Sequence, residues 1–349
     1  MREGELLNGW LPYRMIIDNG TVKFRWFYAG TKRFTEPFFD ESISACLSLP
    51  ENGRGSAALL QLRPGQTPGM TRDERGSFPV TSAEELIRLA GMTQTLAPAG
   101  FIYNISRCGS TLLSQMLVCD PENIVLSEVP LLDEILRLRF HKEIKQHPPV
   151  EELFKAVLTL MGRKRSNDEQ RVFVKTDSWH VQFYDELRSW FPDVPAVLLF
   201  RSPKEVAASH AQSPAMHAVP GLIEAELFGL DAEKVVHMER EHYLEHVLCT
   251  YLQKYSEVLG SDDKATALDY HSGAWKMMER LLAHCKLSPS REVLDAMKSR
   301  TSFHSKKSES AFTGDKERPV AGHDFNRAEE LFRKLQAQYI HSKTEAHGT

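Results

Sequence analysis

The segment at 107–112 combines residue types that bind anions. It reads RCGSTL and stands between an apolar run at 101–106 and a stretch with helical periodicity. At the start of a helix the backbone N–H groups are unpaired, and the helix dipole favours negative charge. Gly109 allows close approach of the backbone to a phosphate, and neighbouring hydroxyl and guanidinium groups add donors. The sequence therefore predicts an anion site, and a capped turn with a surface arginine is the alternative. The residues of the predicted site are Arg107, Cys108, Gly109, Ser110, Thr111 and Leu112.

This loop differs from the Walker A loop of nucleoside triphosphatases. The pattern GxxxxGK[ST] would need glycine where Asn104 stands and lysine where Ser110 stands. Because the lysine that contacts the β- and γ-phosphates is missing, a tight site for a nucleoside triphosphate with Mg²⁺ is not expected. A P-loop kinase or another nucleotide-binding protein of this type remains the alternative.

A second predicted strand ends in an arginine in a specific setting. Arg201 follows the apolar run AVLLF at 196–200, and Pro203 suits the first turn of a helix. Ser209 lies eight residues after the arginine. If the strand leads directly into a helix, Arg201 and Ser209 can converge on one phosphate. The alternative is a capped helix with a surface arginine.

Together the two segments resemble motifs of the sulfotransferases that use 3′-phosphoadenosine 5′-phosphosulfate (PAPS). In that family a loop [R/K]-x-G-[S/T]-T binds the 5′-phosphosulfate, and a later strand ending in R-x-x-x-x-V-x-x-S binds the 3′-phosphate. RCGST and RSPKEVAAS fit these patterns in the same order, over about residues 100–320. The resemblance implies that 107–112 holds the 5′ side of PAPS and that Arg201 and Ser209 hold its 3′-phosphate.

Three further segments agree with this resemblance in order. Lys175 occupies the place of the family's strand-end Lys-Thr, near the sulfuryl group, and DYHSGAW at 269–275 looks like a degraded form of its Tyr-Glu-Asp-Leu segment. The segment 305–318 resembles the family's late basic loop over the 3′-phosphate, with Lys306 and Lys307 as candidate contacts. A solvated run of charges is the alternative for that loop.

The resemblance also implies a general base that takes the proton of the acceptor. The cytosolic branch of the family has a histidine soon after the strand Lys-Thr, whereas this chain has Asp177 there. Other branches use a glutamate just after the second strand, where Glu128 stands, and partial burial would raise its pKa toward a useful value. We rank Glu128 first, Asp177 second and His180 third. An acidic residue serving a helix N-terminus is the alternative for Glu128.

The elements that would position these residues alternate between strands and helices from residue 101 onward. This rhythm predicts an α/β fold of the P-loop NTPase type, a parallel sheet flanked by helices on both faces. Residues 1–95 have a strand or hairpin signal at 18–28 and a long loop, so we expect an N-terminal β-rich module there. Residues 96–345 would form the sulfotransferase-like domain. Within it, a helical insertion at 211–260 would wall the acceptor site.

Composition limits the function classes. The chain has 349 residues and a net charge of −4, which does not favour nucleic acid or an anionic membrane as a partner. Its five cysteines show no CxxC pair, the N-terminus lacks the apolar core of a signal peptide, and no apolar run is long enough to span a membrane. We therefore expect a cytoplasmic protein, of undetermined oligomeric state.

These observations predict an enzyme that moves a sulfuryl group from PAPS to a hydroxyl or amine, leaving adenosine 3′,5′-bisphosphate (PAP). Arg107, Lys175 and Glu128 are the predicted catalytic residues. No metal ion is needed, and the sequence has no clear metal site. The acceptor could be a small molecule, a carbohydrate or a peptide. The remaining alternative is a non-catalytic PAP-binding scaffold.

Overall fold

The computed structural model describes residues 9–52, 71–72, 79–304, 307–311 and 323–345. The chain divides into two compact units, each built from two separate stretches of sequence. The first contains 1–99 and 120–174, and the second contains 100–119 and 175–349. The domain boundary that the sequence predicts near residue 95 stays a prediction.

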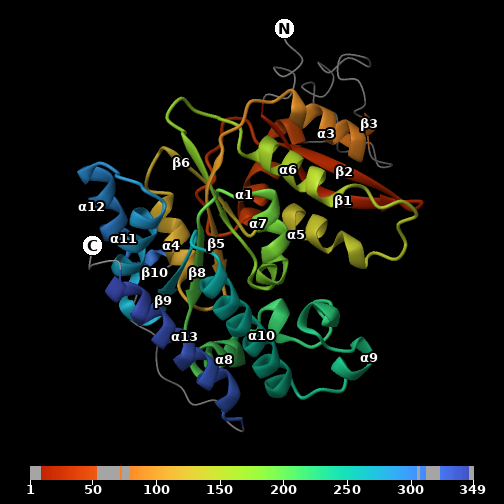
Figure 1. The fold of residues 1–349 in the computed structure, drawn as a ribbon. Coiled ribbons are helices and arrows are strands. Elements are labelled where there is room, and N and C mark those ends of the chain that lie inside the picture. Colours follow the sequence, from red (N-terminus) through yellow and green to blue (C-terminus); the bar gives the residue numbers. More distant parts are fainter. Residues whose placement is uncertain (1–8, 53–70, 73–78, 305–306, 312–322, 346–349) are drawn as a thin grey trace. The chain divides into compact units, whose positions relative to one another are not determined.

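An antiparallel sheet forms the N-terminal part of the first unit (Figure 1). Strands β1 (Trp10–Asp18) and β2 (Thr21–Tyr28) form a hairpin whose turn residues, Asn19 and Gly20, have φ values of 51° and 80°. Positive φ at both positions is what a two-residue hairpin turn with the twist of the strands requires, and Asn-Gly supplies it. β4 (Pro79–Ser82) pairs with β2, and β3 (Thr71–Arg72) pairs with β4.

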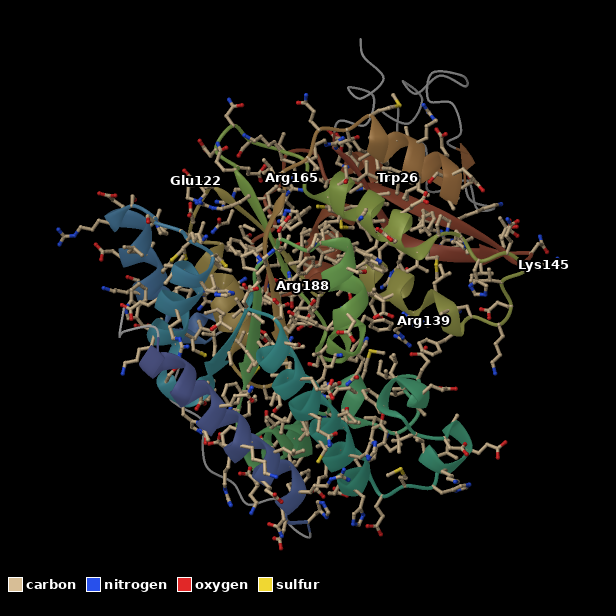
Figure 2. The ribbon with its side chains drawn as sticks, viewed as in Figure 1. Trp26, Glu122, Arg139, Lys145, Arg165 and Arg188 are labelled. Atoms are coloured by element: carbon tan, nitrogen blue, oxygen red, sulfur yellow. The ribbon has the colours of Figure 1, made fainter. Side chains whose placement is uncertain are left out.

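The apolar face of this hairpin packs with helices of the same unit. Trp26 on β2 is fully buried, and its indole N–H donates a hydrogen bond to the Thr81 hydroxyl at 3.0 Å (Figure 2). Ser82 caps α3, because its hydroxyl accepts from the Glu85 N–H as the capping pattern predicts. The other strands and α-helices of the unit are α1 (Phe39–Leu47), α3 (Ala83–Gly91), β6 (Asn123–Ser127), α5 (Pro130–Leu136), α6 (Val150–Met161) and β7 (Arg171–Lys175), whose last residue belongs to the second unit.

The second unit is built on parallel strands. β5 (Pro98–Asn104) pairs with β8 (Ala196–Phe200), which pairs with β9 (Ala265–Asp269), both in parallel. All five residues of β8 are buried, as expected for a central strand covered on both faces. With β6 and β7 these strands belong to one five-stranded sheet in the order β6-β7-β5-β8-β9.

Helices flank this sheet, as Figure 1 shows. Arg188 on α7 secures the connection into β8, since its guanidinium donates to the carbonyls of Phe191, Pro192 and Val194 (Figure 2). The helices of the second unit are α4 (Ser110–Leu117), α7 (Tyr184–Trp190), α8 (Pro203–Gln212), α9 (Ala232–Val235), α10 (Arg240–Ser261), α11 (Ala274–His284), α12 (Arg291–Arg300) and α13 (Asn326–Glu345).

The structure confirms an α/β fold with a parallel sheet flanked by helices and an antiparallel sheet near the N-terminus. β10 (Phe303–His304) and β11 (Lys307–Ala311) pair as a short antiparallel ribbon, which the sequence analysis did not predict. The segment KSESA at 307–311 has no alternation of apolar and polar residues, so it carries no strand signal. Within the described ranges, no helix is both long and apolar enough to cross a membrane.

Candidate functional site

The first corner of the site is the turn from β5 into α4. Ser106, Arg107 and Gly109 have φ values of 71°, 53° and 83°, all in the left-handed region. Non-glycine residues hold such angles at a cost of about 1–2 kcal/mol each, so the surrounding structure must enforce them. Gly109 is the N-cap of α4, and its carbonyl accepts the first helical bond from the Leu113 N–H at 3.0 Å. The first turn of α4 therefore begins at this corner, and a helix N-terminus favours an anion.

Asn104, the last residue of β5, holds this corner in place. Its side-chain oxygen accepts from the Ser106 N–H and from the Ser178 hydroxyl, both at 3.0 Å. Its amide group donates to the Thr176 carbonyl at 2.8 Å. One buried side chain therefore joins the loop after β5 to the segment after β7. Asn104 was not predicted to have this role, although a polar residue at the end of an apolar strand was a usable signal.

Lys175 reaches the same corner from the end of β7. Its side chain is almost fully buried, and its ammonium group donates to the Thr111 hydroxyl at 3.4 Å. Thr176, the next residue, donates its N–H to the Ile102 carbonyl on β5 at 3.0 Å. This hydrogen bond fixes the position of Lys175 relative to the residues of β5. A buried ammonium beside a helix N-terminus concentrates positive charge there.

Arg201 forms the second corner, between β8 and α8. Pro203 occupies the first turn of α8, where it was expected. The Arg201 side chain is largely buried, and its guanidinium stacks over the Tyr270 ring at 4.1 Å from the centroid. Its Nε donates to the Glu205 carboxylate at 2.9 Å. Ser209 is half-buried on the same helix.

The two corners are in direct contact. Arg201 Nη1 donates a hydrogen bond to the Arg107 carbonyl at 3.1 Å. A Cβ added at Gly109 would lie 3.1 Å from the Tyr270 ring, so the ring that supports Arg201 also packs on the first corner. The adjacency follows from the pairing of β5 with β8, because neighbouring parallel strands end at the same edge. The bridging role of Tyr270 was not predicted.

Arg107 also connects the first corner to the segment after α8. Its Nη2 donates to the Ser213 carbonyl at 2.6 Å. Nearby, His217 is almost fully buried, and its ring lies edge-on to His210 with centroids 5.1 Å apart. Burial lowers the pKa of His217 well below its usual value, and His210 and Arg107 act in the same direction. Its imidazole is therefore neutral at physiological pH.

Cys108 is fully buried in the first corner. Burial raises the pKa of its thiol to about 11, although hydrogen bonds to the backbone of Ile105 and Ser110 act in the opposite direction. The thiol is protonated at neutral pH and fills space in the loop. Ser110 is also buried, whereas Thr111 and Leu112 are half-buried.

The candidate bases lie in different units. Glu128 follows β6 in the first unit, is half-buried and has a φ of 52°. Asp177 and His180 follow Lys175 in the second unit, with His180 Nε2 3.7 Å from Asp177 Oδ2. The choice among them stays a prediction. Lys306 lies outside the described residues, and for Lys307 the structure describes only its backbone in β11.

No protein-family model matches the chain, and no curated protein matches it. It resembles sulfotransferase STF1 from Mycobacterium tuberculosis at 16% identity and a TM-score of 0.42, over 72% of this chain and 82% of that one. Sulfotransferase STF9 from Mycobacterium avium gives 12% and 0.45, over 74% and 81%. Mouse sulfotransferase SULT7A1, solved as a complex with PAP, gives 12% and 0.38, over 75% and 92%. These TM-scores are below 0.5, so the likeness alone assigns neither fold nor activity to this chain.

Proposed function

We propose that this protein transfers a sulfuryl group from PAPS to a hydroxyl or amine, with PAP as the other product. The observation that carries the proposal is the 3.1 Å hydrogen bond from Arg201 to the Arg107 carbonyl. It joins two strand-to-helix corners, each of which offers cationic and helix N-terminal donors to an anion. A nucleotide with phosphate groups on its 3′ and 5′ carbons matches two adjacent anion sites.

The donor set fits PAPS. Arg107, Ser110 and Thr111, with the N-terminus of α4, would hold the 5′-phosphosulfate. Arg201 and Ser209 would hold the 3′-phosphate, and Lys306 and Lys307 are predicted to join them. These groups are hydrogen-bond donors or cations, as two phosphate ends require.

Sulfuryl transfer makes one bond and breaks another at sulfur. The acceptor oxygen or nitrogen attacks, and the bond from sulfur to the bridging oxygen of the 5′-phosphate breaks, leaving negative charge on PAP. Lys175 and Arg107 are the chain's groups suited to stabilise that charge. One such positioned donor contributes roughly 3 kcal/mol to lowering a barrier. No step in the proposal passes through a metal ion.

The acceptor loses a proton in this step, and we propose Glu128 as the base that takes it, with Asp177 and His180 next in order. We propose a small molecule, a carbohydrate or a peptide as the acceptor and the cytoplasm as the location. A general base typically contributes about 10²–10⁴-fold to a rate.

The test is turnover. Purified protein is incubated with PAPS and a panel containing a phenol, a sugar and a tyrosine peptide, and PAP release and sulfated product are measured by mass spectrometry. We expect product with at least one acceptor, a loss of about 100-fold in Glu128→Gln, and unchanged PAP binding in that variant. PAP binding without turnover of any acceptor would favour the non-catalytic scaffold. Phosphorylated product from ATP–Mg²⁺ would favour the kinase.

A further inference from the structure

One oxygen of the Glu205 carboxylate lies between the side chains of Arg201 and His271. Oε2 of Glu205 accepts from Arg201 Nε at 2.9 Å and lies 2.9 Å from His271 Nε2. A guanidinium and an imidazole thus converge on a single oxygen at the start of α8. A phosphate oxygen needs the same environment, so the carboxylate marks a place that a phosphate oxygen can take.

The His271 ring is held in this orientation by its own strand end. Nδ1 lies 3.1 Å from Asp269 Oδ1, and the same oxygen accepts from the His271 N–H at 2.9 Å. The other Asp269 oxygen accepts from Gln336 on α13 at 2.8 Å. The Phe332 ring packs edge-on against the imidazole with centroids 6.1 Å apart. Such support from a carboxylate fixes which way a histidine ring faces.

Both ring nitrogens of His271 therefore face carboxylate oxygens, which only accept hydrogen bonds. The imidazolium satisfies both contacts, because it carries two N–H donors. A neutral ring that keeps its proton on Nδ1, toward Asp269, would turn a lone pair toward Glu205 or toward any anion replacing it.

We propose that His271 is a ligand of the 3′-phosphate of the donor and that Glu205 is an internal anion that gives way to it. This inference rests on the proposed function, since it extends the site assigned to Arg201 and Ser209. Glu205 is 37% exposed, so its carboxylate can turn into solvent while Arg201 stays supported by Tyr270. Binding exchanges one anion for another between the same two side chains, Arg201 and His271.

Charged side chains contact His271 from two elements, Asp269 at the end of β9 and Glu205 on α8. From α13, Phe332 packs against the imidazole and Gln336 contacts Asp269. The imidazole is thus held between two carboxylates, of which Glu205 is the more exposed and Asp269 the better supported.

The experiment is calorimetry with PAP and with 5′-AMP, which lacks the 3′-phosphate. We expect Glu205→Gln to tighten PAP binding about threefold or more, because the competing charge is gone. His271→Gln should weaken PAP binding about tenfold, because the ring that faces the phosphate oxygen is lost. Neither variant should change the affinity for 5′-AMP.

The exposed pair His242 and Glu239, 3.1 Å apart, supplies matched controls, since His242→Gln and Glu239→Gln make the same chemical changes elsewhere in the second unit. His271 is 44% exposed, so its substitution should leave the fold intact, and thermal unfolding checks this. If wild type binds PAP but neither Glu205→Gln nor His271→Gln alters its affinity, the inference is wrong and the proposed function stands. If folded wild type does not bind PAP, both are wrong.

Discussion

At the scale of single residues, Gly109 holds a conformation that a side chain would disturb in two ways. Its φ is 83°, and an added Cβ would lie 3.1 Å from the Tyr270 ring. The backbone angle alone costs alanine roughly 1–2 kcal/mol. We expect Gly109→Ala to lower the free energy of unfolding by more than that and to weaken PAP binding about tenfold or more, as measured by urea titration and calorimetry.

Gly221 is the matched control for this substitution. Its φ of 81° is nearly the same, but a Cβ there would meet nothing within 4 Å. Gly221→Ala should therefore show only the cost of the backbone angle and normal PAP affinity. Equal effects of the two substitutions would show that the contact between Gly109 and Tyr270 does not matter.

The buried thiol of Cys108 should make the free energy of unfolding depend on pH. Its pKa is about 11 in the folded chain, above the usual value of 9.0, because burial disfavours the thiolate. A group whose pKa is raised on folding contributes stability that is complete below the unfolded pKa and disappears as pH rises through the folded one. Relative to Cys108→Ser, wild type should lose roughly 2–3 kcal/mol of unfolding free energy between about pH 8.5 and pH 11. Chemical denaturation at several pH values measures this, and parallel pH profiles would contradict it.

At the scale of elements, the ends of β5 and β7 are joined through Asn104. Asn104→Ala would leave the Ser106 N–H, the Ser178 hydroxyl and the Thr176 carbonyl without this partner. We expect a loss of roughly 3 kcal/mol of stability and weaker PAP binding, because the first corner and the segment after Lys175 lose their common support.

Asn52 provides the control for this element. It is also buried and makes three hydrogen bonds, to the N–H and carbonyl of Tyr28 and to the Cys46 carbonyl, all within the first unit. Asn52→Ala should cost similar stability and leave PAP affinity unchanged. If Asn104→Ala lowers stability without lowering affinity, Asn104 supports the fold and not the site.

The elements themselves were largely predictable, because their signals are local. The Asn19-Gly20 turn, the Ser82 cap and the apolar run of β8 each specify an element without reference to the rest of the chain. Helix α12 (Arg291–Arg300) and the ribbon of β10 and β11 were missed. The ribbon has no alternation of apolar and polar residues that would predict it. Helix α12 does carry a local signal that was not used, because the Ser290 hydroxyl accepts from the Val293 N–H as an N-cap.

At the scale of the whole molecule, the sequence predicted which residues would bind the nucleotide, but not which contacts connect them. Two motifs 94 residues apart could be assigned to strand ends, and parallel pairing implied a common edge. Three contacts depend on tertiary packing. They are the hydrogen bond from Arg201 to the Arg107 carbonyl, the stacking of Arg201 on the Tyr270 ring, and the pairing of Glu205 with His271. The sequence also has no local signal that residues 120–174 belong to the same compact unit as residues 1–99.

The measurement that tests the account most directly is calorimetry with PAP, 5′-AMP and ATP–Mg²⁺ on wild type and Arg201→Ala. If the two corners hold opposite phosphate ends of one nucleotide, wild type binds PAP more tightly than 5′-AMP, and Arg201→Ala removes that preference while still binding 5′-AMP. Ser209→Ala should reduce the same preference by a smaller factor. Tight binding of ATP–Mg²⁺ with no response to PAP would contradict the account.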